Sequence, residues 1–344
     1  MIRFDSDYVS HAHPRILTRL QETSGEQNQG YGEDVHCDRA KAYIRTACAA
    51  PDADVHFLVG GTQANTTLIS AILRPHQGVI SANTGHIACH ETGAIESTGH
   101  KVLEVPGIAG KITPLLIRKV YDDHWADAAH EHLVQPALVY ISHPTENGTV
   151  YTLPELEAIS AICREKGLPL MLDGARLGYG LAASGTEVTL PDLARLCDVF
   201  YIGGTKLGTL FGEAVVICNP QYKQDFRYLI KRHGGLLAKG FLLGIQFECL
   251  FEDGLYFDLG QHGVSEAMRI RKAVLDAGLP LQYDTSANQQ FPRVPDALAR
   301  ELAKEFAFLS WEKPNETETV LRFCTSWATR SEDVDALIGA LRRG

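Results

Sequence analysis

The sequence predicts an α/β protein, with a mostly parallel sheet in a large domain and a small α+β domain after it. The first observation is an alternation of short apolar runs with amphipathic helical patterns up to about residue 220. Such alternation gives parallel strands whose crossover helices cover both faces of a sheet. The second observation is a change beyond residue 220 to long helical patterns, followed by short strands and helices. We place the boundary near residue 250, so that residues 1–250 form an N-terminal arm and the large domain, and residues 251–344 the small domain.

Seven apolar runs are the expected strands of the large domain: 55–59, 78–83, 101–106, 137–142, 168–175, 199–204 and 214–219. Helical patterns separate most of them, including one over residues 86–99. Another starts at Thr152 and Glu155, which form a Thr-x-x-Glu capping box. The run 214–219 follows 199–204 so closely that we expect these two to pair antiparallel. Ligands of such sheets bind at the carboxyl ends of the strands.

The C-terminal part is expected to begin with long helices at 221–233, 238–254 and 265–278. The small domain would then continue with strands at 280–285, 289–294 and 319–327 and with helices at 296–306 and 331–343. No linker rich in glycine, serine or proline marks the boundary between the domains.

Composition narrows the class of protein. The formal net charge is −10 and no basic run occurs, which argues against a nucleic-acid partner. No apolar run approaches the roughly 20 residues that span a bilayer, and the first residues lack the pattern of a signal peptide. The eight cysteines are scattered without a CxxC pair, which favours reduced core thiols. We therefore expect a cytoplasmic protein that acts on a small molecule, with neither nucleic acid nor a membrane as a partner.

Two ionisable residues stand where apolar strands end. Lys206 follows the run Val199–Ile202 and two glycines, and it is either a solvated loop lysine or an amine held in a pocket. Partial desolvation would lower its pKa and make it nucleophilic. Asp173 ends another apolar run, where a carboxylate is costly to bury without a partner. Its partner could be a helix N-terminus or Arg176, but together with Lys206 a protonated ring nitrogen is favoured.

Gly60, Gly61 and Thr62 follow a strand and open a helix, so their backbone amides could bind a phosphate. A phosphate cradle, a buried Asp and a strand-end Lys are together the parts that pyridoxal phosphate requires. His86 and His90 would share a helix face and could hold zinc, but no HExxH motif is present and we expect no metal. A ring stacked on a flat cofactor would more plausibly use His86.

The chain resembles the threonine aldolases, which belong to the β-eliminating lyase group of fold-type-I pyridoxal phosphate enzymes. The resemblance runs nearly end to end and is closest to a branch with the kinetoplastid threonine aldolases and the bacterial phenylserine aldolases. It is carried by FDSD (4–7), YGED (31–34), GGTQAN (60–65), GHIACHE (85–91), DGAR (173–176), GGTKLG (203–208) and LRFCT (321–325). It implies an aspartate aminotransferase-like fold and a homodimer or homotetramer with shared active sites.

The resemblance also implies roles for single residues. Lys206 resembles the lysine that binds the cofactor covalently, Asp173 the partner of the pyridine nitrogen, and His86 the residue that stacks on the ring. The implied phosphate ligands are Gly61, Thr62 and Thr205, and the implied carboxylate binders are Ser6, Arg176 and Arg322, with Arg176 also near the cofactor. Tyr31 is expected to reach a neighbouring subunit's site. Arginine suits a carboxylate because its planar fork binds both oxygens.

Two positions depart from the family pattern. Many threonine aldolases carry a second histidine after the strand that corresponds to 137–142, and here Glu146 takes that place, with His143 nearby but offset. Glu146 could be the base for the substrate hydroxyl or only shape the pocket. Lys239 stands where the family typically has an arginine near the phosphate.

These features together predict cleavage of L-threonine, L-allo-threonine or a related β-hydroxy-α-amino acid to glycine and an aldehyde. The alternatives are a phenylserine aldolase, or another β-eliminating lyase that acts on small or aromatic amino acids with the same cofactor. A silent scaffold and a zinc hydrolase are the least favoured alternatives, because the lysine, the aspartate and the arginines are all present.

Overall fold

The computed structural model describes residues 1–343. Its centre is a seven-stranded sheet in the order β2-β8-β7-β6-β5-β3-β4. The strands are Asp54–Leu58 (β2), Gln77–Ala82 (β3), Lys101–Val105 (β4), Gln135–Ser142 (β5), Leu170–Asp173 (β6), Val199–Gly203 (β7) and Glu213–Ile217 (β8). Neighbours are parallel except around β8, which runs antiparallel to both β7 and β2. The expected mostly parallel sheet and the antiparallel pairing of the last two runs are both confirmed.

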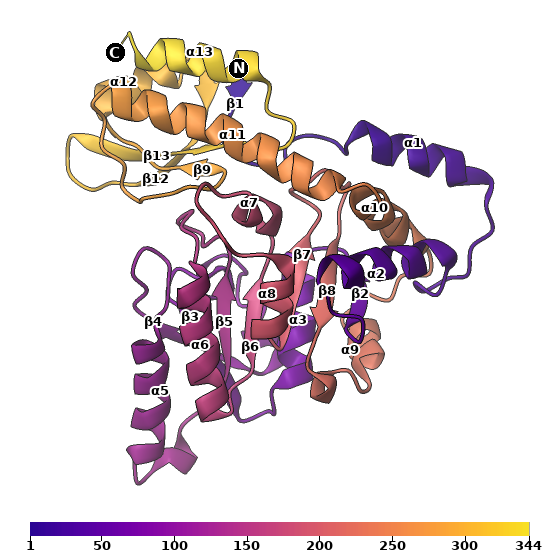
Figure 1. The fold of residues 1–344 in the computed structure, drawn as a ribbon. Coiled ribbons are helices and arrows are strands. Elements are labelled where there is room, and N and C mark those ends of the chain that lie inside the picture. The colour runs from indigo at the N-terminus through magenta and orange to yellow at the C-terminus, as the bar shows by residue number, and fades with distance from the viewer. Residues whose placement is uncertain (344) are drawn as a thin grey trace.

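Alternation along the strands divides the large-domain core into two layers. In β5, Val139 and Ile141 face one cluster, whereas Leu138 and Tyr140 face the other. The first face is covered by α2 (Val35–Ala47), α5 (Pro114–Ala126), α6 (Leu153–Lys166), α8 (Leu190–Leu196) and α10 (Phe241–Phe251). The second face is covered by α3 (Gly61–Ile72) and α9 (Phe226–Arg232), and Figure 1 shows α5, α6 and α8 along one side of the sheet. Each fully buried large apolar side chain contributes about 1.5–3 kcal/mol, so these layers hold the strand ends in place.

The N-terminal part of the chain contributes the helix α1 (Pro14–Glu22). Two further short helices follow strands of the large sheet: α4 (His86–Cys89) after β3 and α7 (Leu177–Leu181) after β6. The capping box at Thr152 and Glu155 is present at the start of α6. The prediction of a helix over residues 86–99 was wrong, because only α4 and a short helical turn at 96–98 form there. Thr92 and Gly93 both adopt positive φ angles, which a continuing helix cannot accommodate.

The C-terminal layer contains α11 (Leu255–Asp276), α12 (Asp296–Leu302) and α13 (Ser331–Leu341). Its strands are β9 (Gln289–Gln290), β10 (Arg293–Pro295), β11 (Phe306–Ala307), β12 (Leu309–Glu312) and β13 (Glu318–Cys324). The prediction of a strand at 280–285 was wrong, since within this segment only Leu281 forms an isolated β-bridge. The expected strand at 289–294 is interrupted at Pro292, which has no amide hydrogen to donate.

The N-terminal strand joins this C-terminal layer. β1 (Ile2–Arg3) pairs in parallel with β11, and Phe4 packs in the same cluster as Phe323 and Val334. Figure 1 shows β1 beneath α13, within the C-terminal layer rather than in the large domain. The boundary near residue 250 stays a prediction. Within residues 1–343, no helix is long and apolar enough to cross a membrane.

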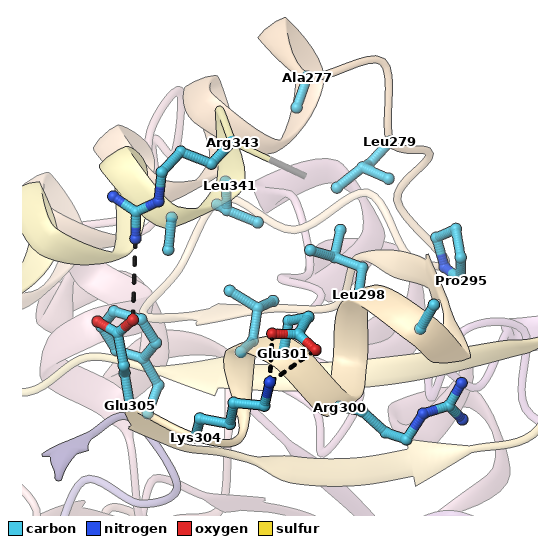
Figure 2. Close-up of a pocket in the computed structure, with 14 residues that line it drawn as sticks. Ala277, Leu279, Pro295, Leu298, Arg300, Glu301, Lys304, Glu305, Leu341 and Arg343 are labelled. Carbon is cyan, nitrogen blue, oxygen red and sulfur yellow. Dashed lines mark hydrogen bonds and ion pairs between the residues drawn. The ribbon is translucent and has the colours of Figure 1, made fainter.

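A hollow of about 600 Å³ lies in the C-terminal layer between the end of α11, α12 and α13. Leu279, Leu298 and Leu341 form its apolar wall, and Arg300 and Arg343 are at its rim (Figure 2). None of the predicted site residues lines this hollow. The predicted site is therefore built elsewhere, at the end of the sheet.

Candidate active site

Two glycine-containing turns press against each other and bring the ends of β6 and β7 together. A Cβ on Gly174 would collide with the carbonyl of Tyr201, and one on Gly203 would collide with the carbonyl of Ala175. The amide of Gly203 donates to the Gly174 carbonyl at 2.9 Å. Only glycine permits this approach of two backbones. The motifs DGAR and GGTKLG are therefore interlocked, which places Asp173 and Lys206 in one site.

Lys206 is held in the turn that follows β7. The Tyr179 hydroxyl donates to the Lys206 carbonyl at 2.7 Å and so fixes the backbone of the turn. Burial lowers the pKa of the Lys206 amine, and the nearby Arg176 guanidinium lowers it further. An amine in these surroundings is more easily deprotonated than a surface lysine and is a better nucleophile.

Asp173 is a buried carboxylate surrounded by donors. Tyr140 donates its hydroxyl to Asp173 Oδ2 at 2.5 Å, Asn65 donates to the same oxygen at 3.2 Å, and the amide of Ala175 donates to Oδ1 at 3.0 Å. Burial would raise the pKa of Asp173, but His86 and the hydroxyls of Tyr140 and Tyr201 outweigh it and hold the pKa below its ordinary value. The group therefore carries a fixed negative charge at neutral pH.

His86 is oriented by a second buried carboxylate. Its Nδ1 lies 2.9 Å from Glu91 Oε1, and that oxygen also accepts a hydrogen bond from Asn65 Nδ2 at 2.8 Å. Burial would lower the pKa of His86, but the hydrogen bond to Glu91 and the charge of Asp173 raise it. Asn65 thus bridges the carboxylates of Glu91 and Asp173, and Nε2 is the ring nitrogen of His86 that Glu91 leaves free.

Glu146 lies directly beside His86. Its Oε1 accepts from the His86 amide at 3.0 Å and from Ser142 Oγ at 2.7 Å, while its buried Oε2 has no partner among the described residues. Burial raises the pKa of Glu146, and the Ser142 hydrogen bond only partly opposes this. His143 is packed against Tyr151, with a pKa that burial lowers to about 4. That Glu146 takes the place of the family's second histidine stays a prediction.

The start of α3 offers the predicted anion site. Gly60 is the residue before the helix, and the first amides of an α-helix have no partner within it. The strand register puts Leu58 opposite Glu213 and Glu213 opposite Gly203, so the start of α3 and the turn with Thr205 flank the same strand end. Lys239 is exposed in the loop after α9, a loop that is tied to α3 by a hydrogen bond from Gln63 to the His233 carbonyl.

The predicted carboxylate binders differ in how far they are already paired. Arg176 makes two hydrogen bonds to Asp7, at 2.7 and 3.1 Å, so its fork is occupied. Arg322 is 8% exposed, donates once to the Asp5 carbonyl at 2.8 Å, and leaves its Nε without a partner among the described residues. Its guanidinium lies 5.3 Å from the centre of the Trp311 ring.

A hydroxyl and an aromatic ring complete the list of predicted site residues. Ser6 Oγ is buried without a partner among residues 1–343, although buried hydroxyls nearly always have one. A free arginine fork and a free hydroxyl together suit a carboxylate ligand. Tyr31 lies apart from these groups, exposed and packed under Lys231 at 5.1 Å. Its expected contact with a neighbouring subunit stays a prediction.

Several site residues were missed at the level of sequence: Asp7, Asn65, Glu91, Tyr140, Ser142, Glu213 and Trp311. Asp7 and Asn65 lie inside motifs that carried the family resemblance, and Glu213 precedes an apolar run just as Asp173 ends one. A polar residue at a terminus of a buried strand was the signal that could have found Ser142 and Glu213. Nothing in the sequence indicates that Asp7 contacts Arg176.

The residues present fit pyridoxal phosphate. An ionised Asp173 is suited to a protonated ring nitrogen, and a Lys206 amine with a lowered pKa is suited to the aldehyde. The start of α3 is suited to the phosphate. Among residues 1–343, no group of three or more histidine, cysteine or acidic side chains is arranged to hold a metal.

The chain is similar over most of its length to several known proteins. Residues 4–324 match the family described as beta-eliminating lyase. A low specificity L-threonine aldolase of Pseudomonas sp. (strain NCIMB 10558) is 32% identical over 99% of this chain and 97% of its own length. The structure of Leishmania major threonine aldolase is 44% identical with a TM-score of 0.97, and the match covers 100% of this chain and 99% of that one. Thermus thermophilus aspartate aminotransferase, 15% identical with a TM-score of 0.73 over 100% and 91% of the two chains, is similar in fold.

Proposed function

This chain belongs to the beta-eliminating lyase family, and from that membership we propose that it is a pyridoxal-phosphate-dependent aldolase. Its reaction is the cleavage of the Cα–Cβ bond of L-threonine and related β-hydroxy-α-amino acids to glycine and an aldehyde. The observation that carries the proposal is the full-length similarity to threonine aldolases, 44% identical in one solved structure. Arg322, Ser6 and Lys206 supply the groups that an amino-acid substrate needs.

Binding of the substrate falls to residues at both ends of the chain. The free Nε edge of Arg322 and the hydroxyl of Ser6 hold the α-carboxylate. Trp311 supports the plane of the Arg322 guanidinium from one face. Arg176, already paired with Asp7, contributes positive charge near Lys206 and the cofactor, and its direct contact with the carboxylate stays a prediction of the family resemblance.

Proton transfer falls to His86, Glu146 and Lys206. When bound, pyridoxal phosphate accepts the electron pair that cleavage leaves on Cα. Asp173, whose lowered pKa keeps it negatively charged, would hold the protonated ring nitrogen. His86 directs Nε2 to the substrate hydroxyl because Glu91 occupies Nδ1, and it removes the hydroxyl proton. Glu146 is the alternative base, since burial raises its pKa and makes its carboxylate more basic.

Gly61, Thr62 and Thr205 bind the phosphate, with Lys239 as an outer cation. We expect a cytoplasmic homodimer or homotetramer in which Tyr31 completes a neighbouring site. The roles of Gly61, Thr62 and Thr205 are supported by their position at one end of the sheet, whereas those of Lys239 and Tyr31 rest on the family resemblance.

The test is an assay of the purified protein with pyridoxal phosphate against L-threonine, L-allo-threonine and L-phenylserine. Equimolar glycine and aldehyde are expected, whereas ammonia and a keto acid would instead indicate elimination. Lys206→Ala should lower kcat by about a thousandfold or more. Lys101→Ala, which removes an exposed lysine at the start of β4, is the matched control and should retain activity. Aldol cleavage that persists in Lys206→Ala would refute the scheme.

A further inference from the structure

Glu213 is a buried carboxyl group next to the predicted phosphate site. It is the first residue of β8 and is 3% exposed. Because β8 is antiparallel, its amino end lies beside the carboxyl ends of β2 and β7, opposite Leu58 and Gly203. Side chains 213, 215 and 217 face the layer that contains α3. A negative charge at this position would oppose any anion bound at the start of α3.

The contacts of Glu213 involve a predicted phosphate ligand. Its Oε1 lies 2.9 Å from the Thr205 hydroxyl oxygen, and the Gly212 amide donates to that same hydroxyl oxygen at 3.0 Å. Its Oε2 is buried without a partner among the described residues. No cation is paired with this carboxyl group in residues 1–343, although ionised carboxylates are rarely buried without one.

The Thr205 hydroxyl has one proton, so the state of Glu213 decides where that proton goes. If Glu213 is ionised, the Thr205 hydroxyl must donate its proton to the Glu213 carboxylate. Thr205 then has no proton left to donate to a phosphate oxygen. If Glu213 carries a proton, it donates to Thr205, which accepts this bond and the one from Gly212. The Thr205 proton can then point at another acceptor, either the Gly212 carbonyl at 3.5 Å or a phosphate oxygen.

The surroundings favour the protonated form. Burial raises the pKa of Glu213 to about 8, the Thr205 hydroxyl and the Lys206 charge oppose the rise, and Asp173 adds to it. The Tyr201 phenol, which lies on the same face of the sheet, stays neutral because burial raises its own pKa.

The charged groups around the turn are Lys206, Asp173 and Arg176, and Arg176 is already paired with Asp7. The first turn of α3 has no acidic residue. On α10, the side chain that binds the turn is the amide of Gln246, which accepts from the Leu210 amide. Proton exchange at Glu213 is therefore the ionisation nearest to Thr205.

We propose that Glu213 is a positioning residue that keeps its proton while the cofactor is bound, and that this proton directs the Thr205 hydroxyl to the cofactor phosphate. The inference rests on the proposed role of Thr205 as a phosphate ligand. It requires a cofactor affinity that falls when Glu213 ionises, because a donor is lost and a negative charge appears beside the phosphate.

The test is the Kd of the full-length apoprotein for pyridoxal phosphate between pH 7 and 9.5, measured by the change in cofactor absorbance. Pyridoxal, which lacks the phosphate, is the control ligand and corrects for ionisation of Lys206. Affinity for pyridoxal phosphate relative to pyridoxal should fall by about tenfold or more as pH rises through 8, the size of a lost hydrogen bond to a charged group. An equal fall for both ligands overturns the proposal.

Glu213→Gln keeps the shape and a donor but cannot ionise, so its relative affinity should not change with pH. Thr205→Val should weaken pyridoxal phosphate binding, and adding Glu213→Gln to it should then have no further effect. An unchanged pH dependence in Glu213→Gln overturns the inference while leaving the aldolase assignment intact. An unchanged affinity in Thr205→Val removes its premise.

An infrared difference between the wild-type holoprotein and Glu213→Gln at pH 7 gives a second readout that does not depend on affinity. It should show the carbonyl band of a protonated carboxylic acid only in the wild type, and carboxylate bands there instead would refute the proposal.

Discussion

Asp7→Asn is a sharp test of how the N-terminal segment is held in the site. Asp7 is 1% exposed and binds Arg176 through both of its oxygens, and Asn288 donates to Oδ2 at 3.0 Å. Asparagine keeps the shape and one acceptor but removes the charge. The Arg176 guanidinium would then be buried without a counter-charge, which is the costly half of a broken buried ion pair.

The magnitude follows from the ionisation of Asp7. Burial would raise its pKa, but Arg176 and Lys206 lower it from 3.8 to about 2. A shift of this size corresponds to about 2.5 kcal/mol of folding free energy. Because the folded-state pKa is the lower one, this stability is present above pH 3.8 and is lost as pH falls towards 2. We expect Asp7→Asn to lower the free energy of unfolding by about 3 kcal/mol at pH 7.

The assay is urea unfolding of the protein at a fixed concentration, because any assembly would make the result depend on concentration. Asp5→Asn is the matched control, since Asp5 pairs with Arg3, whose side chain is 58% exposed. The control should change stability little, because exposed ion pairs are weak. The wild type should lose its advantage over Asp7→Asn between pH 4 and 2. If Asp7→Asn is no less stable than Asp5→Asn, the reasoning is refuted.

Three further substitutions test the site. Glu91→Gln should lower the pKa of His86, so the acidic limb of kcat/KM against pH should move to lower pH; an unmoved limb would contradict the proposed orientation of the ring. Arg322→Lys should raise KM about tenfold or more with a smaller effect on kcat, because an ammonium group cannot replace the fork; an unchanged KM would exclude Arg322 from carboxylate binding. Gly174→Ala should lower the free energy of unfolding by about 2 kcal/mol, because its Cβ meets backbone, whereas Gly25→Ala has open space and should be nearly neutral.

The strands of the large sheet were predictable because each is an apolar run between helical patterns. The strand predictions failed where a strand forms only because a distant segment pairs with it, and not because of its own amino-acid composition. Residues 280–285 alternate like a strand, but only Leu281 finds a partner. Strands β1 and β11 have two residues each and leave no pattern in the sequence. Their existence depends on a contact between positions about 300 residues apart, which periodicity cannot reveal.

The site was predictable where a residue type is unusual for its local position. Lys206 and Asp173 are charged residues at the ends of apolar strands, and that alone marks them. The predicted role of Arg322 came only from the family pattern, because in the sequence a carboxylate-binding arginine on a strand cannot be told from a solvent-exposed one. The pairing of Arg176 with Asp7 and the proximity of Glu213 to Thr205 depend on how distant segments pack. Such contacts appear only in three dimensions.

The pairing of β1 with β11 has a consequence for the way the protein is made. Ile2 cannot find its partner Phe306 until the ribosome has added about 300 more residues, which takes about 15 to 60 seconds at ordinary rates of translation. During that time β1 has no strand to pair with, although the sheet with Lys206 can already form. A nascent chain interrupted before residue 306 would therefore contain Lys206 and Asp173 but lack Arg322 and the strand that pairs with β1.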